Sequence, residues 1–194
     1  MEHAVLGRED YFTMIEGGKR YTVADIEALP EGERAELIDG QMFLMASPTL
    51  THQDILVWLS TNIWNYIKEH KGVCKVLPAP FAVYIKNDDY NYVEPDISVI
   101  CDRNKLDEKG CHGAPDWVIE IVSPSSRTMD YARKQLLYEA SGVREYWIVD
   151  PNKQSVVVHD FEHRKDMEIY PFSERVKAGI FEELFLDFRE IEQM

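Results

Sequence analysis

Two nearly continuous apolar runs, separated by one helical segment, constrain the fold more than any other part of the chain. The runs cover residues 116–123 and 145–151, and neither alternates polar with apolar side chains. That pattern predicts strands buried on both faces of a sheet. Between them, residues 128–140 have helical spacing, and Gly142 ends the helix. A strand, a helix and a strand in this order predict a right-handed crossover that joins two parallel strands.

Turn and capping signals place other elements around this unit. Asp39-Gly40 predicts a hairpin between residues 35–38 and 41–46. Ser47 and Pro48 predict the start of a helix, as N-cap and first helical residue. One side of that helix is expected to be buried, because apolar residues repeat every four positions at Ile55, Leu59, Ile63 and Ile67.

The remaining segments complete a mixed α/β pattern. A short helix is predicted over residues 21–30, with Thr22 as its N-cap. Residues 181–191 read as an amphipathic tail, either strand or helix. The predicted fold class is α/β (α+β), with a mixed central β-sheet flanked by helices and an N-terminal hairpin. Further strands are predicted at residues 73–77, 81–85, 92–101, 154–160 and 167–172.

The length and hydropathy of the chain predict one domain with a full core and without a membrane span. The chain of 194 residues fits one domain, predicted over residues 21–194, after an irregular arm over residues 1–20. Apolar residues make up 45% of the sequence, which is enough for a full core. No apolar run approaches the roughly 20 residues that a bilayer span needs. The N-terminal residues lack the basic and apolar pattern of a secretory signal, so a cytoplasmic location is expected.

The formal charge of −14 and the three cysteines limit the partners and the structural bonds that are expected for this protein. Such a charge argues against charge-driven adhesion to nucleic acid or to anionic membranes. It does not exclude a nuclease, because a site made of carboxylates is itself acidic and bound divalent cations reverse its local sign. Cys74, Cys101 and Cys111 show no Cys-x-x-Cys spacing, so neither a disulfide framework nor a structural zinc site is expected.

Two carboxylates lie in otherwise apolar segments, where a buried strand would normally have none. Asp96 stands at the entry to one predicted strand, and Glu120 lies between Ile119 and Ile121 in another. A charge in such a run is costly unless it is paired or binds a metal. Mg²⁺ takes oxygen ligands and is often held by one or two carboxylates. Asp96, Glu120 and the carbonyl of Ile121 are therefore candidate metal ligands for phosphodiester hydrolysis.

Asp130, Lys134 and Tyr138 are four residues apart and form one stripe on the helix that follows Glu120. Lys134 could reach back to that carboxylate, orient a water molecule and stabilise charge in the transition state. The same spacing fits an ordinary ion pair between Asp130 and Lys134 on a helix surface, worth a few tenths of a kcal/mol. Both interpretations stay open at the level of sequence.

These motifs together resemble the Uma-two family of bacterial restriction endonuclease-like proteins, in the PD-(D/E)XK nuclease superfamily. The resemblance implies a restriction-endonuclease-like core, DNA phosphodiester hydrolysis that depends on Mg²⁺ or Mn²⁺, and a homodimer. It covers roughly residues 20–190. The matching residues are Glu36 to Gly40, His52, Pro95-Asp96, Glu120 to Pro124, Asp130, Lys134, Tyr138, Gly142-Val143 and Glu145 to Pro151.

Carried over from the resemblance, Asp96 matches the aspartate of the family motif and Glu120 matches its second acid. The motif's lysine is expected two positions after the glutamate, where this chain has Val122. Either Lys134 replaces it from the following helix or the site is impaired. Glu36 resembles an additional acid that some members bring from an earlier element, and it would complete a two-metal site.

Three functions are compatible with these observations. The first is a metal-dependent DNA endonuclease with Asp96, Glu120, Lys134 and Glu36 as catalytic residues. The second is a catalytically impaired binding or regulatory protein with the same fold, which the acidic charge and Val122 favour. The sequence has no G-x-S-x-G elbow, so serine hydrolysis has no support, and the lack of a glycine-rich phosphate loop argues against nucleotide-dependent classes.

The third function is a dimeric interaction protein whose carboxylates are simply buried and paired. Trp58, Trp64 and Tyr66 are predicted on or near the helix face opposite the core stripe, and aromatic residues are enriched at interfaces. His52 also has two interpretations: a histidine at the edge of the core, hydrogen-bonded to a neighbour, or a general base.

Overall fold

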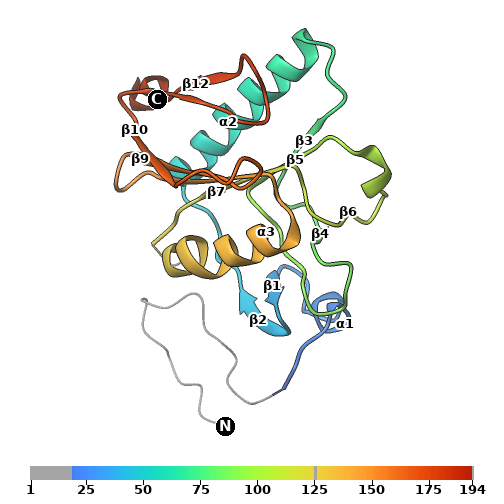
Figure 1. Ribbon diagram of the computed structural model, residues 1–194. Helices are drawn as coiled ribbons and strands as arrows, with labels where there is room; N and C mark the ends of the chain where they lie inside the picture. The colour runs from blue at the N-terminus through green and yellow to red at the C-terminus, as the bar shows by residue number, and fades with distance from the viewer. Residues whose placement is uncertain (1–18, 125, 194) are drawn as a thin grey trace.

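The computed structural model describes residues 19–124 and 126–193, and its centre is a six-stranded sheet in the order β10-β9-β8-β7-β5-β3 (Figure 1). β7 and β8 are parallel, and the other neighbouring pairs are antiparallel. The predicted mixed central sheet is therefore confirmed. Its strands are β3 (Lys75–Pro78), β5 (Ile97–Ile100), β7 (Trp117–Ile121), β8 (Glu145–Asp150), β9 (Ser155–Asp160) and β10 (Glu168–Pro171).

The crossover between the two parallel strands follows the predicted order of strand, helix and strand. It consists of a π-helical segment, η2 (Met129–Lys134), continued by α3 (Gln135–Ser141). Gly142 ends the helix with a φ of 89°, a left-handed conformation that glycine adopts without a Cβ clash. The chain then enters β8 in register with β7.

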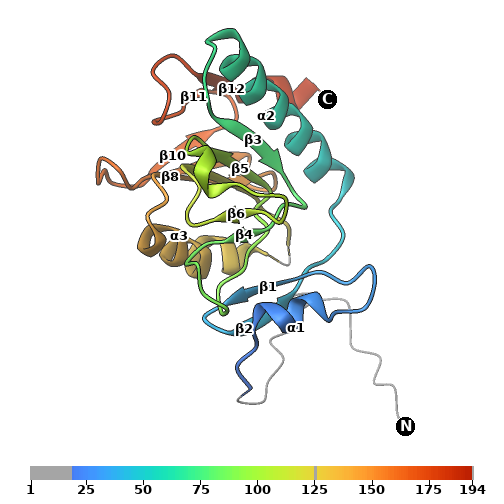
Figure 2. The same cartoon turned by 90° about the vertical axis from the view of Figure 1, so that its right-hand side faces the viewer.

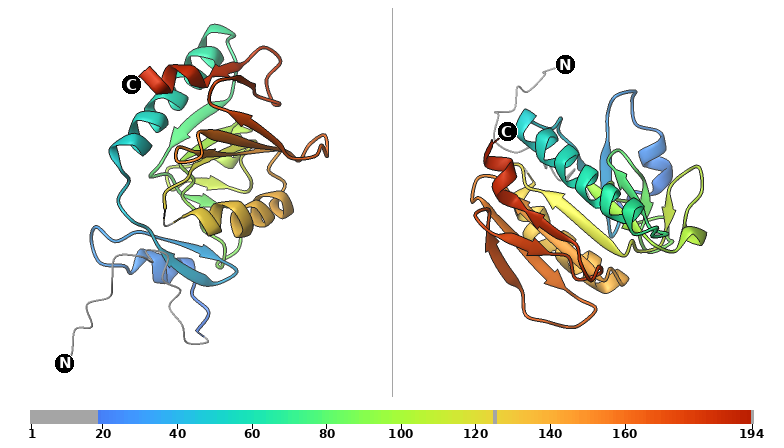
Figure 3. Two further views of the ribbon diagram at one scale, coloured as in Figure 1. Left: turned by 90° about the vertical axis from the view of Figure 1, so that its left-hand side faces the viewer. Right: turned by 90° about the horizontal axis from the view of Figure 1, so that it is seen from above.

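Helices cover both faces of the sheet (Figures 1 and 3). α2 (Leu50–Glu69) packs on one face through its predicted stripe, which is buried, and η2 with α3 covers the other. Side chains of β7 alternate between these two cores, as a strand requires: Trp117 and Ile119 face α2, and Val118 faces α3. Glu120 consequently points toward α3, into the layer between the sheet and the crossover helix.

The N-terminal hairpin and the short helix α1 (Val23–Glu27) lie together below the sheet in the view of Figure 2. The hairpin consists of β1 (Ala35–Ile38) and β2 (Gln41–Leu44), joined by the predicted Asp39-Gly40 turn. Leu37 packs toward α1, whereas Ile38 joins the core beneath α3. Because side chains alternate along a strand, Glu36 turns to the same side as Ile38, toward the crossover helix.

The remaining helices and strands in the described residues are short. The predicted strands at 81–85 and 92–101 are shorter than expected, and the C-terminal tail contains both a strand and a 3₁₀-helix. The prediction of an arm over residues 1–20 falls mostly outside the described residues. The elements are β4 (Val83–Tyr84), η1 (Arg103–Lys105), β6 (Cys111–His112), β11 (Arg175–Lys177), β12 (Phe185–Asp187) and η3 (Phe188–Gln193).

No helix in the described part of the chain combines the length and the apolar character that a bilayer span requires.

The start of α2 differs from the prediction, because Thr49 rather than Ser47 is the N-cap. The Thr49 hydroxyl accepts the backbone N–H of His52 at 3.3 Å, which satisfies a donor that the first helical turn leaves free.

Trp58 was expected on or near the face opposite the core stripe, and this prediction is wrong. Its side chain packs in the core beneath α2, edge-on to Phe188 with 5.2 Å between ring centroids. The indole N–H donates to Glu190 at 2.9 Å. Trp64, by contrast, is 51% exposed.

Cys74 and Cys101 form a disulfide, although the cysteine spacing provided no reason to expect disulfide bonding. β3 and β5 are antiparallel with Lys75 opposite Ile100, so the residues that flank this pair also face each other. Spacing in the sequence does not reveal the bond, because the sheet register brings together residues 27 positions apart. Cys111 is free and buried.

Alkylation of the denatured protein measures this pairing. Without reduction, iodoacetamide should add one group per chain, to Cys111, and after reduction it should add three. Intact-mass spectrometry counts the groups. The Cys101→Ser variant serves as the control, since it should take up two groups without reduction; uptake of three by the unreduced wild type would disprove the disulfide.

Candidate active site

Lys134 lies at the centre of a buried group of carboxylates. Its Nζ is 2.8 Å from Glu36 Oε2, 2.9 Å from Glu120 Oε1 and 3.8 Å from Asp130 Oδ1. Lys134 is 3% exposed and Asp130 only 1%, so the interpretation of these two residues as a helix-surface ion pair is wrong. They belong to a network in which one ammonium group faces several acids.

The crossover helix directs its stripe at Glu120, as the spacing predicted. The Tyr138 hydroxyl donates to Glu120 Oε1 at 2.6 Å, beside the contact from Lys134. Tyr146 donates its hydroxyl to the carbonyl of Asp130 at 3.0 Å and so ties the helix to β8. The segment from Asp130 to Lys134 is π-helical, a geometry that is rare and frequent at functional sites.

Asp96 meets Glu120 because β5 and β7 are antiparallel, which places the start of β5 beside the end of β7. Asp96 Oδ2 accepts the backbone N–H of Ile121 at 2.7 Å and lies 3.1 Å from Nε2 of His52. His52 comes from the first turns of α2, and its Nδ1 is buried without a hydrogen-bond partner among the described residues. Asp96 is therefore oriented from both sides, by a strand and by a helix.

Glu36 enters the network from the hairpin. Its Oε1 accepts the backbone N–H of Glu94 at 3.0 Å, and its Oε2 forms the ion pair with Lys134. Both carboxylate oxygens thus have a partner within the protein. In this geometry Glu36 fixes the position of the Lys134 ammonium, and its predicted role at a second metal stays a prediction.

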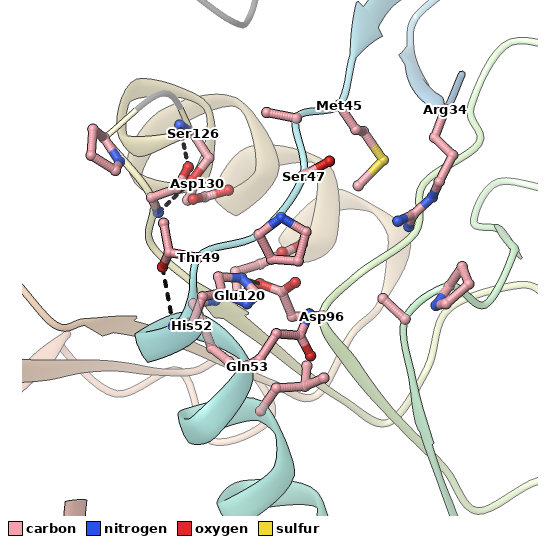
Figure 4. A pocket seen from close by; sticks show the side chains of 18 of the residues that line it. Arg34, Met45, Ser47, Thr49, His52, Gln53, Asp96, Glu120, Ser126 and Asp130 are labelled. Carbon is pink, nitrogen blue, oxygen red and sulfur yellow. Dashed lines mark hydrogen bonds and ion pairs between the residues drawn. The ribbon is translucent and has the colours of Figure 1, made fainter. Parts of the chain in front are cut away.

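The network opens into a pocket of about 890 Å³ at the end of β7 (Figure 4). Figure 4 shows Asp96, Glu120 and His52 close together at the centre, with Asp130 above them in this view, on the crossover helix. Apolar residues from the segment before α2 and from the Ala79-Pro80 turn form other walls. The polar and charged lining residues are Arg34, Ser47, Thr49, His52, Gln53, Asp96, Glu120, Ser123, Ser126, Asp130 and Lys134.

Burial and like charges shift the proton affinities in this network. Burial raises the pKa of Glu120 to about 7; Lys134 opposes the shift, and the charges of Asp96 and Glu36 add to it. Burial likewise raises the pKa of Asp130 well above its usual value, again opposed by Lys134. The surrounding carboxylates raise the pKa of Lys134 against its burial, so this amine stays protonated.

Burial lowers the proton affinity of His52, but the hydrogen bond and charge of Asp96 outweigh it and raise the pKa. The network thus contains acids with a high proton affinity beside a permanently protonated lysine. Such perturbed groups in one cleft are typical of functional sites, although structural networks show them too.

The structure brings together every predicted site residue: Glu36, Asp96, Glu120, Ile121 and Lys134. Within residues 19–124 and 126–193, however, no three His, Cys, Asp or Glu side chains form a ready-made metal cage. Arg34 also lines the pocket and was not among the predicted residues. No periodicity marks Arg34, because it stands in a polar turn and only tertiary packing brings it to the pocket.

A mixed sheet with a parallel pair, its crossover helix and an acidic pocket at the end of the central strand together define a protein with a nuclease-like fold. The chain belongs to the Uma2 family, described as "Putative restriction endonuclease", whose family model matches residues 23–189. The resemblance inferred from the sequence is thereby confirmed.

The proteins similar to this chain include one curated relative and one solved structure. The uncharacterised protein slr1290 of Synechocystis sp. (strain ATCC 27184 / PCC 6803 / Kazusa) is 30% identical over 135 residues, 69% of this chain and 68% of the relative. A crystal structure from Anabaena variabilis ATCC 29413, described as "a putative nuclease belonging to DUF820", superposes with a TM-score of 0.73 at 24% identity, covering 89% of this chain and 97% of that one. The second match shows a shared fold.

Replacing Lys134 by methionine should strongly destabilise the protein, because it leaves several carboxyl groups buried without a cation. We expect a loss of about 3–5 kcal/mol in the free energy of unfolding at pH 8. The loss should shrink at pH 5, where the acids take up protons. Urea unfolding followed by circular dichroism measures both values. Lys86→Met, which removes an ion pair of the exposed Asp39, should cost below about 1 kcal/mol; equal losses for both variants would contradict the network.

Glu120→Gln tests the sign of the pKa shift. Because the pKa of Glu120 rises from 4.5 to about 7 on folding, the folded protein holds this proton at pH values where the unfolded chain has lost it. This group therefore lowers wild-type stability as pH rises through that window. In metal-free buffer, Glu120→Gln should gain on the order of 3 kcal/mol relative to wild type between those pH values. A difference that does not change with pH would contradict the shift.

Proposed function

We propose that this protein is a metal-dependent endonuclease that hydrolyses DNA phosphodiester bonds with Mg²⁺ or Mn²⁺. The observation that supports the proposal best is the convergence of Asp96, Glu120 and a protonated Lys134 on one pocket. Phosphodiester hydrolysis needs stabilisation of negative charge and an oriented water molecule, and these groups can supply both. Membership of the Uma2 family supports the same reaction class.

The donor set fits a hard divalent cation. Lys134 and Tyr138 both bind Oε1 of Glu120, and Ile121 and His52 both contact Oδ2 of Asp96. Glu120 Oε2 and Asp96 Oδ1 lie outside these bonds and, with the Ile121 carbonyl, form an oxygen set of the kind that Mg²⁺ takes. A metal held there would lower the pKa of a bound water and neutralise charge on the phosphate.

Lys134 has a defined part in this proposal. An ammonium group has three donors; one of them hydrogen-bonds to Glu120, and the Glu36 carboxylate forms an ion pair with the group at 2.8 Å. The third contact, to Asp130, is 3.8 Å long, which is beyond hydrogen-bond range. Since its raised pKa keeps the amine protonated, Lys134 would donate to the attacking water or the phosphate and would not abstract a proton.

A second candidate is a catalytically impaired binding or regulatory protein with the same fold. It is favoured by the way Lys134 already neutralises Glu36 and Glu120 and by the missing cage of three ligands among the described residues. The homodimer also stays a prediction. Both candidates retain the nuclease-like fold, and they differ in whether metal binds and DNA is cut.

Nicking of supercoiled plasmid tests the proposal. Wild type should nick DNA with Mg²⁺ or Mn²⁺ and not with EDTA, and Glu120→Gln should lose at least about a hundredfold in rate, the scale of one electrostatic group at a reacting centre. Because Glu120→Gln is also expected to be more stable at neutral pH, lost activity with retained stability cannot come from misfolding. Calorimetric titration with Mn²⁺ adds a readout independent of turnover.

The matched control is Glu162→Gln, which removes an exposed acid that pairs with Arg144 and should leave nicking unchanged. Asp96→Asn should weaken both Mn²⁺ binding and nicking. Wild type that binds no Mn²⁺ at millimolar concentration and nicks no DNA would leave the second candidate. Equal nicking by wild type and Glu120→Gln would point to a contaminating nuclease and defeat the proposal.

A further inference from the structure

Arg34 is the cation of the pocket that the proposed reaction does not use. It stands immediately before β1, where its carbonyl accepts the backbone N–H of Met45 at 2.8 Å. Its side chain is 36% exposed and lines the pocket. Figure 4 shows the Arg34 side chain on the side of the pocket where the hairpin lies, with its guanidinium group turned toward the interior.

The buried carboxylate of Glu94 holds one edge of this guanidinium group in place. Nε and Nη2 of Arg34 both donate to Oε2 of Glu94, with Nε at 2.7 Å. Nη1 has no hydrogen-bond partner among the described residues. Arginine presents its donors in a rigid planar fork, so fixing one edge also fixes the direction of the other.

Hydrogen bonds with Tyr92 and Glu36 fix the position of Glu94. Its Oε1 accepts the Tyr92 hydroxyl at 2.6 Å, and its backbone N–H donates to Oε1 of Glu36. Glu36 in turn binds Lys134. The free edge of Arg34 is therefore tied to the proposed reacting centre through short, buried contacts and is pre-organised for a ligand that enters the pocket.

The charges of the chain and of the pocket indicate which kind of ligand Arg34 can bind. The chain has a formal charge of −14, so long-range attraction does not draw DNA to it. Among the described residues that line the pocket, Arg34 and Lys134 are the cations besides His52, and Lys134 is engaged by two carboxylates. A phosphate oxygen is the anion that an arginine edge binds most favourably in a nucleic-acid substrate.

We propose that Arg34 binds a backbone phosphate of the DNA, next to the phosphate that reacts, and so positions the strand in the pocket. This inference rests on the proposed nuclease function. The contact between Arg34 and a phosphate would provide local attraction for DNA in a protein whose net charge repels it. The competing interpretation is that Arg34 and Glu94 form an ion pair that only anchors the hairpin.

Binding of a short fluorescein-labelled DNA duplex, and of its single strand, separates the two interpretations. Anisotropy is measured over a range of salt, with Ca²⁺ in place of the catalytic metal. Arg34→Gln should raise Kd about tenfold, the value of one charge-assisted hydrogen bond, and reduce the slope of log Kd against log salt by about one unit. Under nicking conditions, KM should rise more than kcat falls.

Two variants control for structure. Arg144→Gln removes an arginine of similar exposure, 37%, which pairs with Asp116 and Glu162 away from the pocket residues, and it should change neither Kd nor slope. Glu94→Gln keeps the Arg34 charge, so it should retain the wild-type slope. If Arg34 only anchors the hairpin, Glu94→Gln and Arg34→Gln should weaken binding equally.

The outcomes also separate this inference from the proposed function. If wild type nicks and binds DNA but Arg34→Gln has the wild-type Kd and slope, the phosphate contact is wrong and the nuclease proposal stands. If wild type neither nicks nor binds DNA, both are wrong. A lowered melting temperature of Arg34→Gln with unchanged binding would identify a purely structural ion pair and overturn the inference.

Discussion

The ammonium group of Lys134 is the interaction on which the rest of the site depends. Glu36, Glu120 and Asp130 come from three different elements and are almost completely buried. Without a cation among them, their mutual repulsion and their loss of hydration would drive them to take up protons or to leave the core. Lys134 thereby joins the hairpin, the central strand and the crossover helix around one charge.

The buried carboxylates around Lys134 lower the stability of the fold, and this cost indicates that the group serves a function. The raised proton affinity of Glu120 and the buried Oδ1 of Asp130, which has no hydrogen-bond partner among the described residues, are both features that a core selected for stability alone would avoid. Groups held in such a state are typical of sites whose charges are meant to meet a ligand. The pocket at the end of β7 provides the room for one.

The position of the lysine explains how this chain departs from the family motif. Val122 lies two residues after Glu120 on the same side of the strand, packs into the core beneath α3, and donates its backbone N–H to Val149 at 2.8 Å. Lys134 reaches the same carboxylate from the opposite wall of that layer. Lys134 thus places a positive charge beside Glu120 from the helix, and its role as a replacement for the lysine of the motif stays a prediction.

Local patterns in the sequence determined the central unit: the paired buried strands and their crossover, the stripe of α2, the Asp39-Gly40 turn, and Asp96, Glu120 and Lys134 as candidate residues. These are properties of neighbouring residues, such as periodicity and turn chemistry, and one sequence contains them. Tertiary structure alone decided the Cys74–Cys101 bond, the burial of Trp58 and of Asp130 with Lys134, and the place of Arg34 in the pocket. Each depends on sheet register or on packing between segments far apart in the chain, and the energy of such contacts leaves no periodic trace in the residues that make them.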